Sequence, residues 1–379
     1  MCIRDSSNSY SNYRHQANIA HQYHQYLDYG VKPENIIVFD YDDVANHKSN
    51  PFPGKLYNLP GDDAKDYYEG LVIDYKGADI TKQNLFDCLL GVENGNGNKV
   101  LKSTSEDKVF INYYDHGAPN LICLINERIK KDELQDVLKQ MAEKKMFKHF
   151  VLYIEACYSG SMGLDFPEDL GISIVTAAND RESSWGWYCG DEAVVKGKNL
   201  GSCLGDEFSV FWMEDTDKGE QKTETLEEQF ARIKNGVTKS HASRYGDTSF
   251  AQDLIGEYVG YPEKKLYKEV AEEAWDSRDS KMLYFRHKYL TTTGAEKRKY
   301  EKLYLEEVSL RQQIDRYINS IAKADRLYSA ETGSVKDFNC YKAGIAQMEA
   351  IFGRNDYQFK YYNVLANMCN ENPLVFAKY

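Results

Sequence analysis

The chain has 379 residues, of which 28% are charged and 42% hydrophobic, and its net charge is −12 at pH 7. This length predicts two or three domains with a large buried core, and the composition is typical of a globular protein. The negative charge argues against a nucleic-acid partner, because such partners require a basic surface. The sequence contains no run of 18 apolar residues, so it predicts no membrane-spanning helix.

The cysteines and the start of the chain give two further expectations. The eight cysteines do not have the density of a disulfide scaffold, and no Cys-x-x-Cys or Cys/His cluster resembles a zinc site. Residues 1–6 show neither a signal peptide nor a strand pattern. We therefore expect a truncated start, with the first strand of the domain missing.

Helical and strand patterns alternate along the first two thirds of the chain. Apolar residues at helical spacing predict helices at 12–29, 83–90 and 131–145, and the capping box Thr225-Leu-Glu-Glu228 opens another. Unbroken apolar runs predict buried strands at 36–39, 109–114, 150–154 and 172–177, with a strand-like segment at 208–213. This alternation predicts an α/β fold: a mostly parallel sheet with helices on both faces.

The alternation stops near Leu254. Helical spacing then predicts one long helix through Leu303–Ile321 and two more at 345–352 and 357–368. We divide the chain into an α/β domain at 1–255, a linker at 256–290 and a small all-α unit at 291–379. Residues 263–379 hold 20 Lys and Arg against 17 Asp and Glu, a net charge of +3, which leaves −15 for the rest of the chain.

Cys157 and His116 each follow directly after a predicted parallel strand. Because the carboxyl ends of parallel strands share one edge of a sheet, the two side chains can meet there if the strands are neighbours. A cysteine nucleophile needs a base, a group that orients the base, and donors for the oxyanion. His116 can be the base, Asn12 its orienting group, and Gly117 a backbone donor. From spacing alone, a buried core cysteine and an ordinary histidine explain the pair as well.

Asp115-His-Gly117, followed by Glu155-Ala-Cys-Tyr-Ser-Gly-Ser161, resembles the legumain family (peptidase family C13), the asparaginyl endopeptidases or vacuolar processing enzymes of the caspase-like clan. The resemblance is strong over residues 8–250 and weak over 280–379. It implies a caspase-like sheet followed by a helical prodomain. Further blocks match in order: Asn12–Gln16, Tyr41–Asp43, Asn50–Gly54, Thr176–Asn179, Glu182–Ser184 and Trp212–Asp215.

The resemblance implies a cysteine endopeptidase that cuts after Asn, and after Asp at acidic pH, through an acyl-enzyme on Cys157. The pocket for the residue before the cut maps to Arg14, His15, Glu155, Ser184 and Asp206. An amide side chain both donates and accepts hydrogen bonds, so it suits a pocket with an arginine and two carboxylates. Without the resemblance, a simple buried ion pair between Arg14 and Glu155 is the alternative interpretation.

Two disulfides are also implied by the resemblance, Cys189–Cys203 beside the pocket and Cys340–Cys369 in the helical unit, as suits an oxidising compartment. The helical unit would be an autoinhibitory prodomain, held by opposite net charge and released when acid protonates Asp and Glu. No Asn lies between 256 and 318, so Asp276 and Asp279 are the available positions for self-cleavage.

The implied partners are proteins and peptides with Asn or Asp before the cut, the chain's own prodomain and cystatin-type inhibitors, without nucleic acid, membrane, metal or organic cofactor. The implied location is the lysosome, the vacuole or outside the cell, and a transpeptidase or ligase side activity stays open. Three alternatives remain. The first is a relative of the GPI-anchor transamidase, which would lack the pair of Glu155 and Asp206. The second is a peptidase specific for Lys or Arg, which Arg14 disfavours. The third is a catalytically inactive binding or storage homologue.

Overall fold

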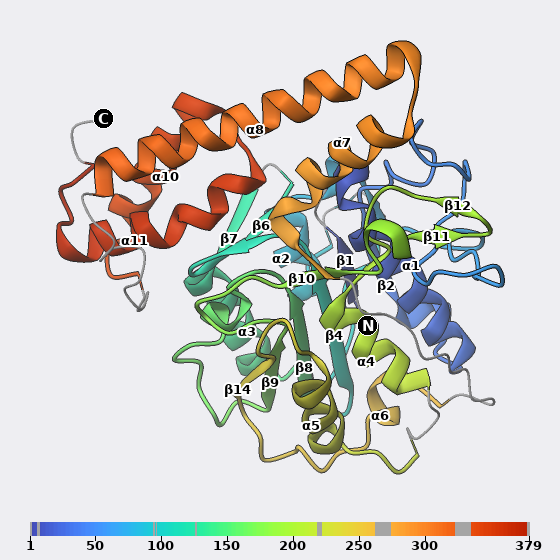
Figure 1. Ribbon diagram of the computed structural model, residues 1–379. Helices are drawn as coiled ribbons and strands as arrows, with labels where there is room; N and C mark the ends of the chain where they lie inside the picture. The colour runs from blue at the N-terminus through green and yellow to red at the C-terminus, as the bar shows by residue number, and fades with distance from the viewer. Residues whose placement is uncertain are drawn as a thin grey trace.

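The computed structural model describes residues 2–5, 8–93, 95, 97–125, 127–217, 222–261, 274–322 and 335–376. Its centre is a seven-stranded sheet in the order β14-β9-β8-β4-β1-β2-β3 (Figure 1). All neighbouring strands are parallel except β14, which runs antiparallel to β9. The strands are β1 Cys2–Asp5, β2 Ile37–Asp40, β3 Tyr75–Lys76, β4 Lys108–Tyr114, β8 His149–Glu155, β9 Ile172–Thr176 and β14 Ser243–Gly246.

Strand β1 corrects the expectation that the first strand is missing. The backbone of Cys2–Asp5 pairs in parallel with β2 on one side and β4 on the other. Because both of its edges are hydrogen-bonded to neighbours, this short strand is fixed by backbone pairing and does not need a strong side-chain pattern of its own. Strand β1 therefore fills the place between β4 and β2, and the sheet is continuous there.

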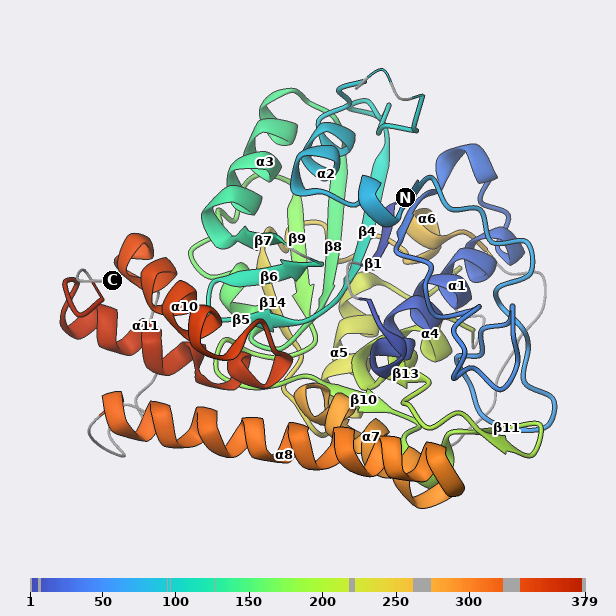
Figure 2. The ribbon, with the colours of Figure 1, turned by 90° about the horizontal axis from the view of Figure 1, so that it is seen from above.

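Helices cover both faces of the sheet, as predicted (Figure 2). On one face, Ile19 of α1 shares an apolar core with Trp212 of α4 and Ile233 of α5. On the other face, Leu85 of α2 and Leu134 of α3 pack with the sheet residue Leu152. The helices are α1 Tyr13–Asp28, α4 Glu207–Asp217, α5 Leu226–Gly236 and the short α6 Gly256–Val259 on the first face, and α2 Lys82–Leu89 and α3 Lys131–Glu143 on the second.

Local sequence signals explain one helix end and one wrong prediction. The Thr225 hydroxyl accepts a hydrogen bond from the Glu228 N–H at 3.2 Å, and the Glu228 carboxylate accepts one from the Thr225 N–H at 2.8 Å, so the predicted capping box is confirmed. The strand-like segment at 208–213 is instead part of helix α4. Its side chains are buried on several sides, and a short apolar run of this kind does not distinguish a strand from a buried helix.

Three small sheets, which the sequence analysis did not predict, surround the edge of the main sheet. All their strands are two to four residues long, too short for a periodic pattern. Directly after β4 comes a sheet of β5 Gly117–Ala118, β6 Leu121–Leu124 and β7 Glu127–Lys130. The others are β11 Val194–Val195 with β12 Lys198–Asn199, and β13 Gly205–Asp206 with β10 Trp185–Trp187 and β15 Ala274–Asp276.

The last part of the chain is helical. Part of the linker predicted at 256–290, residues 262–273, lies outside the described residues; the rest contains β15 and helix α7 Ser280–Thr291. The predicted long helix is α8 Gly294–Ala322, and the two later ones are α10 Phe338–Phe352 and α11 Tyr362–Glu371, preceded by a 3-10 helix at Asp356–Tyr361. We call the described residues from 294 onward the cap.

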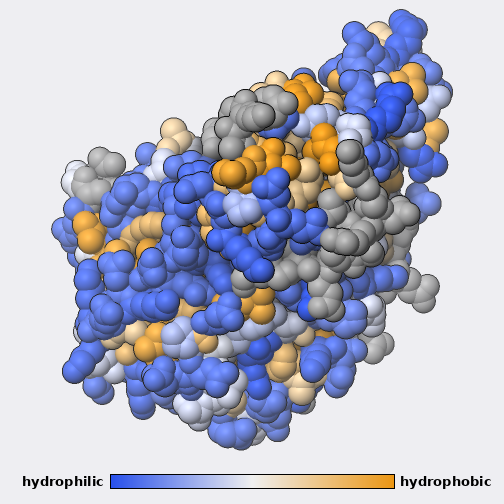
Figure 3. Space-filling model, turned by 90° about the vertical axis from the view of Figure 1, so that its left-hand side faces the viewer, coloured by the Kyte–Doolittle hydropathy of each residue, from blue (hydrophilic) through white to orange (hydrophobic). Residues whose placement is uncertain are grey.

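The cap extends across one end of the molecule. Helix α8 runs along one side of the domain, and α10 and α11 pack near one of its ends (Figures 1 and 2). The face on the side of α10 and α11 is largely hydrophilic, with apolar side chains gathered in its upper part (Figure 3). None of the helices within the described residues is long and apolar enough to cross a membrane.

Candidate active site

The ends of β4 and β8 bring His116 and Cys157 side by side. The two strands are neighbours, and their register ends with Tyr114 opposite Glu155, two residues before each candidate side chain. The backbones are so close here that a Cβ placed on Gly117 would lie 2.2 Å from the carbonyl oxygen of Cys157. Only glycine fits at this position without moving the chain.

Cys157 is almost fully buried in this capped structure. The chain turns sharply after it, because Tyr158 has a positive φ of 55°. The Cys157 Sγ lies 4.0 Å from the carbonyl oxygen of Ser184 and 3.9 Å from its hydroxyl. Burial raises the pKa of the Cys157 thiol, although the nearby Arg278 guanidinium acts in the opposite direction. The sulfur is therefore held as a thiol and not as a thiolate.

His116 contacts Asn12, the residue predicted to orient it. The His116 Nε2 lies 3.1 Å from the Asn12 Oδ1, and the Asn12 amide donates to the carbonyl of Asn8 at 3.1 Å. Because a side-chain carbonyl only accepts hydrogen bonds, this contact places a proton on Nε2 and leaves the lone pair on Nδ1. Nδ1 is buried and has no hydrogen-bond partner among the residues that the structure describes. Within the described residues, no hydrogen bond joins His116 to Cys157.

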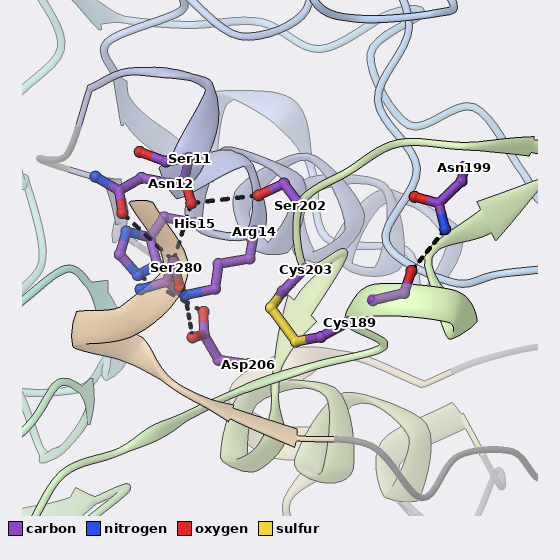
Figure 4. Close-up of a disulfide and its surroundings, with 11 residues drawn as sticks. Ser11, Asn12, Arg14, His15, Cys189, Asn199, Ser202, Cys203, Asp206 and Ser280 are labelled. Atoms are coloured by element: carbon purple, nitrogen blue, oxygen red, sulfur yellow. Dashed lines mark hydrogen bonds and ion pairs between the residues drawn. A yellow bond between two sulfur atoms is a disulfide. The ribbon is translucent and has the colours of Figure 1, made fainter. Parts of the chain in front are cut away.

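Arg14 and Asp206 form the centre of the predicted pocket (Figure 4). The Arg14 Nε donates to the Asp206 Oδ1 at 2.6 Å, and the Asn18 amide donates to the Asp206 Oδ2 at 2.8 Å. The Arg14 Nη1 lies 3.3 Å from the Asn12 Oδ1, so the pocket is connected to the group that orients His116. The guanidinium thus pairs with Asp206, and not with Glu155 as in the simple ion-pair interpretation.

Glu155 is the second buried carboxyl group of the pocket. Its Oε2 accepts hydrogen bonds from the Ser209 N–H at 3.2 Å and the Ser209 hydroxyl at 2.8 Å. Burial, together with the charge of Asp206, raises the pKa of Glu155 well above its usual range. Burial also raises the pKa of Asp206, against the opposing charge of Arg14. The pocket therefore contains one fixed cation and two carboxyl groups that resist ionisation.

His15 and Ser184 complete the set of predicted pocket residues. The His15 Nε2 is 3.8 Å from the Asp206 Oδ2, and the His15 ring meets the His116 ring edge-on at 5.4 Å. Burial, helped by the charge of Arg14, lowers the pKa of His15 well below its usual range, so the ring is neutral. The sequence analysis missed Asn18 and Ser209, because both are ordinary helix residues whose role depends on how α1 and α4 pack.

The structure contains both expected disulfides. Cys189–Cys203 lies beside the pocket, where Gly186 of β10 faces it: a Cβ on Gly186 would be 2.8 Å from the Cys203 Sγ and 3.4 Å from the Arg14 Cδ (Figure 4). This bridge therefore packs against the strand that borders Arg14. Cys340–Cys369 joins α10 to α11 within the cap.

The linker supplies an extra strand beside Cys157. Strand β15 pairs antiparallel with β10, with Asp276 opposite Trp185. The Arg278 guanidinium donates two hydrogen bonds to the Asp276 carboxylate, at 3.0 and 2.8 Å, and lies 6.0 Å above the ring of Tyr158. Main-chain pairing at a sheet edge is a common way for proteins to bind an extended peptide. The linker thus occupies a position that an extended substrate could take.

The cap reaches His116 from the other side. The Asp356 Oδ2 lies 3.7 Å from the His116 Nε2, and the Phe359 ring lies 5.9 Å from the imidazole. Leu121 and Cys123 of β6 share an apolar core with cap residues such as Tyr341. Entry to the Cys157 and His116 region is therefore bordered by β15 and by the cap.

Local charges at the cap contact differ from the net charges that the sequence analysis used. Arg128 of β7 pairs with Glu349 of α10, and His116 faces Asp356. In both pairs the carboxylate belongs to the cap, although residues 263–379, which include the cap, have a net charge of +3. The contact is therefore described by these individual pairs and not by the overall charge difference.

The sheet, the cysteine and histidine at adjoining strand ends, and the arginine–carboxylate pocket define a cysteine endopeptidase with a caspase-like fold. Residues 5–261 match the model of the Peptidase C13 family, and the chain belongs to this family. It is 37% identical over 400 residues to the vacuolar-processing enzyme delta-isozyme of Arabidopsis thaliana, covering 96% of this chain and 85% of the relative. It is 33% identical over 399 residues to the legumain of Canavalia ensiformis, covering 96% and 83%. A hemoglobinase of Schistosoma japonicum is 40% identical over 276 residues, covering 72% and 63%.

Proposed function

We propose that this cysteine endopeptidase cuts after asparagine, and after aspartic acid at acidic pH. The pocket beside Cys157 carries the proposal, because one buried guanidinium stands among two buried carboxyl groups there. Arg14 can donate to the oxygen of an asparagine side chain, while Glu155 or Asp206 accepts from its nitrogen. A protonated aspartic acid has the same shape and also donates one hydrogen bond, which explains why it would bind only in acid.

The proposed mechanism uses Cys157 as nucleophile and His116 as base. The thiol gives its proton to the Nδ1 of His116, which Asn12 supports from the other side of the ring. The sulfur then attacks the peptide carbonyl, and the backbone N–H groups of Gly117 and Cys157 stabilise the oxyanion. As the C–N bond breaks, the leaving amine takes the proton from His116 and a thioester remains. Water hydrolyses the thioester with His116 again as base; an amine in place of water would give the transpeptidase side activity.

We infer further that the capped chain is a zymogen. Strand β15 lies against β10, Arg278 lies close enough to Cys157 to affect its pKa, and Asp356 faces His116. These groups border the reacting atoms from two sides, so a peptide substrate needs them to leave. Because residues 256–318 contain no asparagine, we propose self-cleavage after Asp276 or Asp279, which would separate the domain from its cap.

The names of the relatives support a location and a set of partners. Because several of them are vacuolar-processing enzymes, we propose the vacuole or lysosome for this protein. An acidic compartment would both release the cap and protonate aspartic acid in a substrate. The proposed partners are proteins with Asn or Asp before the cut, the cap itself and cystatin-type inhibitors.

The test compares wild type with Cys157→Ser on peptides that differ only in Asn, Asp, Lys or Gly before the cut. After acid treatment at about pH 5.5, wild type should cleave the Asn peptide fastest and the Asp peptide next, and the variant should cleave neither. Cleavage of the Lys peptide alone would refute the pocket assignment. Failure to cleave any peptide, even after the cap is trimmed away, would favour an inactive homologue.

A further inference from the structure

A cavity lies between the domain and the cap, away from Cys157. Its volume is about 320 Å³, and its walls come from both sides: residues of β6, β7 and the starts of α2 and α3 on the domain, and one face of α10 on the cap. This volume is at the lower end of the range for small-molecule sites, about 300–1,000 Å³. The cavity exists only while α10 is docked, because α10 forms one entire wall.

The walls of this cavity are amphiphilic. Leu121 of the domain and Phe338 and Ile345 of the cap supply apolar surface. Four basic side chains and two carboxylates also line it; Lys82 pairs with Glu133 at 2.9 Å, and Arg128 pairs with Glu349. Lys130 also lies 3.8 Å from Glu133, so this carboxylate is shared by two lysines, and the lining has a net positive charge.

Two buried hydrogen-bond donors add a second observation. The hydroxyl of Tyr341, a completely buried residue, and the Nε of Arg128 have no hydrogen-bond partner in the described structure. One belongs to the cap and the other to the domain, and both residues line the cavity. Buried polar groups of folded proteins are almost always hydrogen-bonded, so these two donors are available to an acceptor that approaches them from the cavity.

We propose that the cavity binds a small amphiphilic carboxylate. Its apolar part packs on Leu121, Phe338 and Ile345, and its negative head accepts hydrogen bonds from the Tyr341 hydroxyl and the Arg128 Nε, with Lys342 near the opening. Because the ligand contacts both walls, it binds the docked arrangement and not the separated one. By mass action it stabilises the docked cap; if the capped chain is the zymogen proposed above, the ligand also slows activation.

The binding test uses full-length Cys157→Ser protein at neutral pH, which keeps the cap attached and does not depend on proteolysis. Sodium hexanoate is the probe; hexan-1-ol, which lacks the charge, and acetate, which lacks the apolar part, are the controls. Calorimetric titration should show saturable binding of hexanoate alone, at concentrations below about 10 mM. The thermal midpoint of unfolding should rise with hexanoate concentration.

Two variants on this background identify the site. Tyr341→Phe keeps the ring but removes the donor, and should weaken hexanoate binding by roughly tenfold. Ala346→Phe fills the cavity from α10 and should abolish binding without lowering the midpoint of unfolding. Lys302→Ala is the matched control, because this exposed lysine of α8 is not part of the lining and should leave binding unchanged.

The proposal has clear contrary outcomes. It is overturned if hexanoate does not bind or if hexan-1-ol binds as tightly as hexanoate. It is also overturned if Tyr341→Phe and Ala346→Phe both bind hexanoate as tightly as the Cys157→Ser parent does. These outcomes say nothing about cleavage after asparagine, since the protein tested has no catalytic sulfur. Conversely, a protein that fails to cleave any peptide would leave the cavity and its ligand unaffected.

Discussion

The pocket beside Cys157 holds two carboxyl groups, Glu155 and Asp206, and one guanidinium, Arg14, and all three residues are buried. The Arg14 guanidinium pairs with Asp206, Glu155 is hydrogen-bonded to Ser209 instead, and burial raises the pKa of both carboxyl groups. Such a pocket is least costly to bury when one carboxyl group is protonated, because an unpaired buried charge is strongly unfavourable. The residues that we propose as the substrate pocket are therefore also residues that respond to pH.

Replacing Glu155 by Gln should change how stability depends on pH. A carboxyl group whose pKa is raised on folding binds its proton more tightly in the folded state. Wild type therefore loses free energy of unfolding as pH rises from the ordinary carboxyl value, about 4, through the raised pKa. The test compares full-length Cys157→Ser protein with and without Glu155→Gln. The thermal midpoint of the Glu155→Gln protein minus that of its parent should rise between pH 4.5 and pH 8. The exposed Glu34→Gln is the control, and a difference that stays constant with pH would contradict this prediction.

Gly117→Ala should remove activity through geometry alone. The new Cβ would lie 2.2 Å from the Cys157 carbonyl oxygen, so the chain must shift where we place an oxyanion donor. Loss of one such donor typically lowers kcat by about 100- to 1,000-fold. The ratio kcat/KM on an Asn peptide is the measurement, after removal of the cap. Gly97→Ala is the control: its φ of 76° makes an alanine strained, but a Cβ there meets nothing within 4 Å, so kcat/KM should not change. Normal activity of Gly117→Ala would refute the assignment.

At the scale of elements, long patterns were predictable and short ones were not. The apolar runs at 109–114 and 150–154 and the capping box at Thr225 each give a local signal, and the structure places β4, β8 and α5 there. Strand β1 and the sheet of β5, β6 and β7 depend on neighbouring strands for their position, so no local pattern marks them. The same limit applies to the site: Cys157 and His116 follow strand ends, whereas Ser209 reaches Glu155 only through the packing of α4.

The two disulfides should have different effects when they are removed. Cys189–Cys203 closes a loop beside Arg14, and its chain-entropy contribution is about 3 kcal/mol for a sequence separation of 14 residues. Changing both cysteines to serine should therefore lower the midpoint of unfolding and raise KM for an Asn peptide. The matched pair of changes at Cys340 and Cys369 should loosen the cap but leave KM of the trimmed enzyme unchanged. Equal KM in both double variants would contradict a role for the first bridge in the pocket.

At the scale of the molecule, the cap and linker hold the site by contacts that differ in their response to acid. Burial alone would raise the pKa of Asp276, but the hydrogen bonds and charge of Arg278 outweigh it, and the pKa lies below its usual value. The stabilisation from this pair is therefore present above the ordinary carboxyl pKa and is lost only as pH falls through the lower, folded-state value. The Asp276–Arg278 pair of the linker therefore persists on mild acidification, and we expect the pairs between cap and domain to break first.

Glu349→Gln should make the cap leave more readily. Glu349 pairs with Arg128 across the contact, and the substitution removes that charge while it keeps the size of the side chain. Breaking one partner of a half-buried pair leaves Arg128 without its counter-ion, which disfavours docking. When full-length protein is incubated over a pH series, activity on an Asn peptide should appear at a higher pH in Glu349→Gln than in wild type. Glu301→Gln on α8, for which the structure gives no ion pair to the domain, is the control. An identical pH midpoint of activation in all three proteins would show that the Arg128–Glu349 pair does not hold the cap. The pair of Asp356 with His116 would then be tested in the same assay by Asp356→Asn, which removes the charge facing His116.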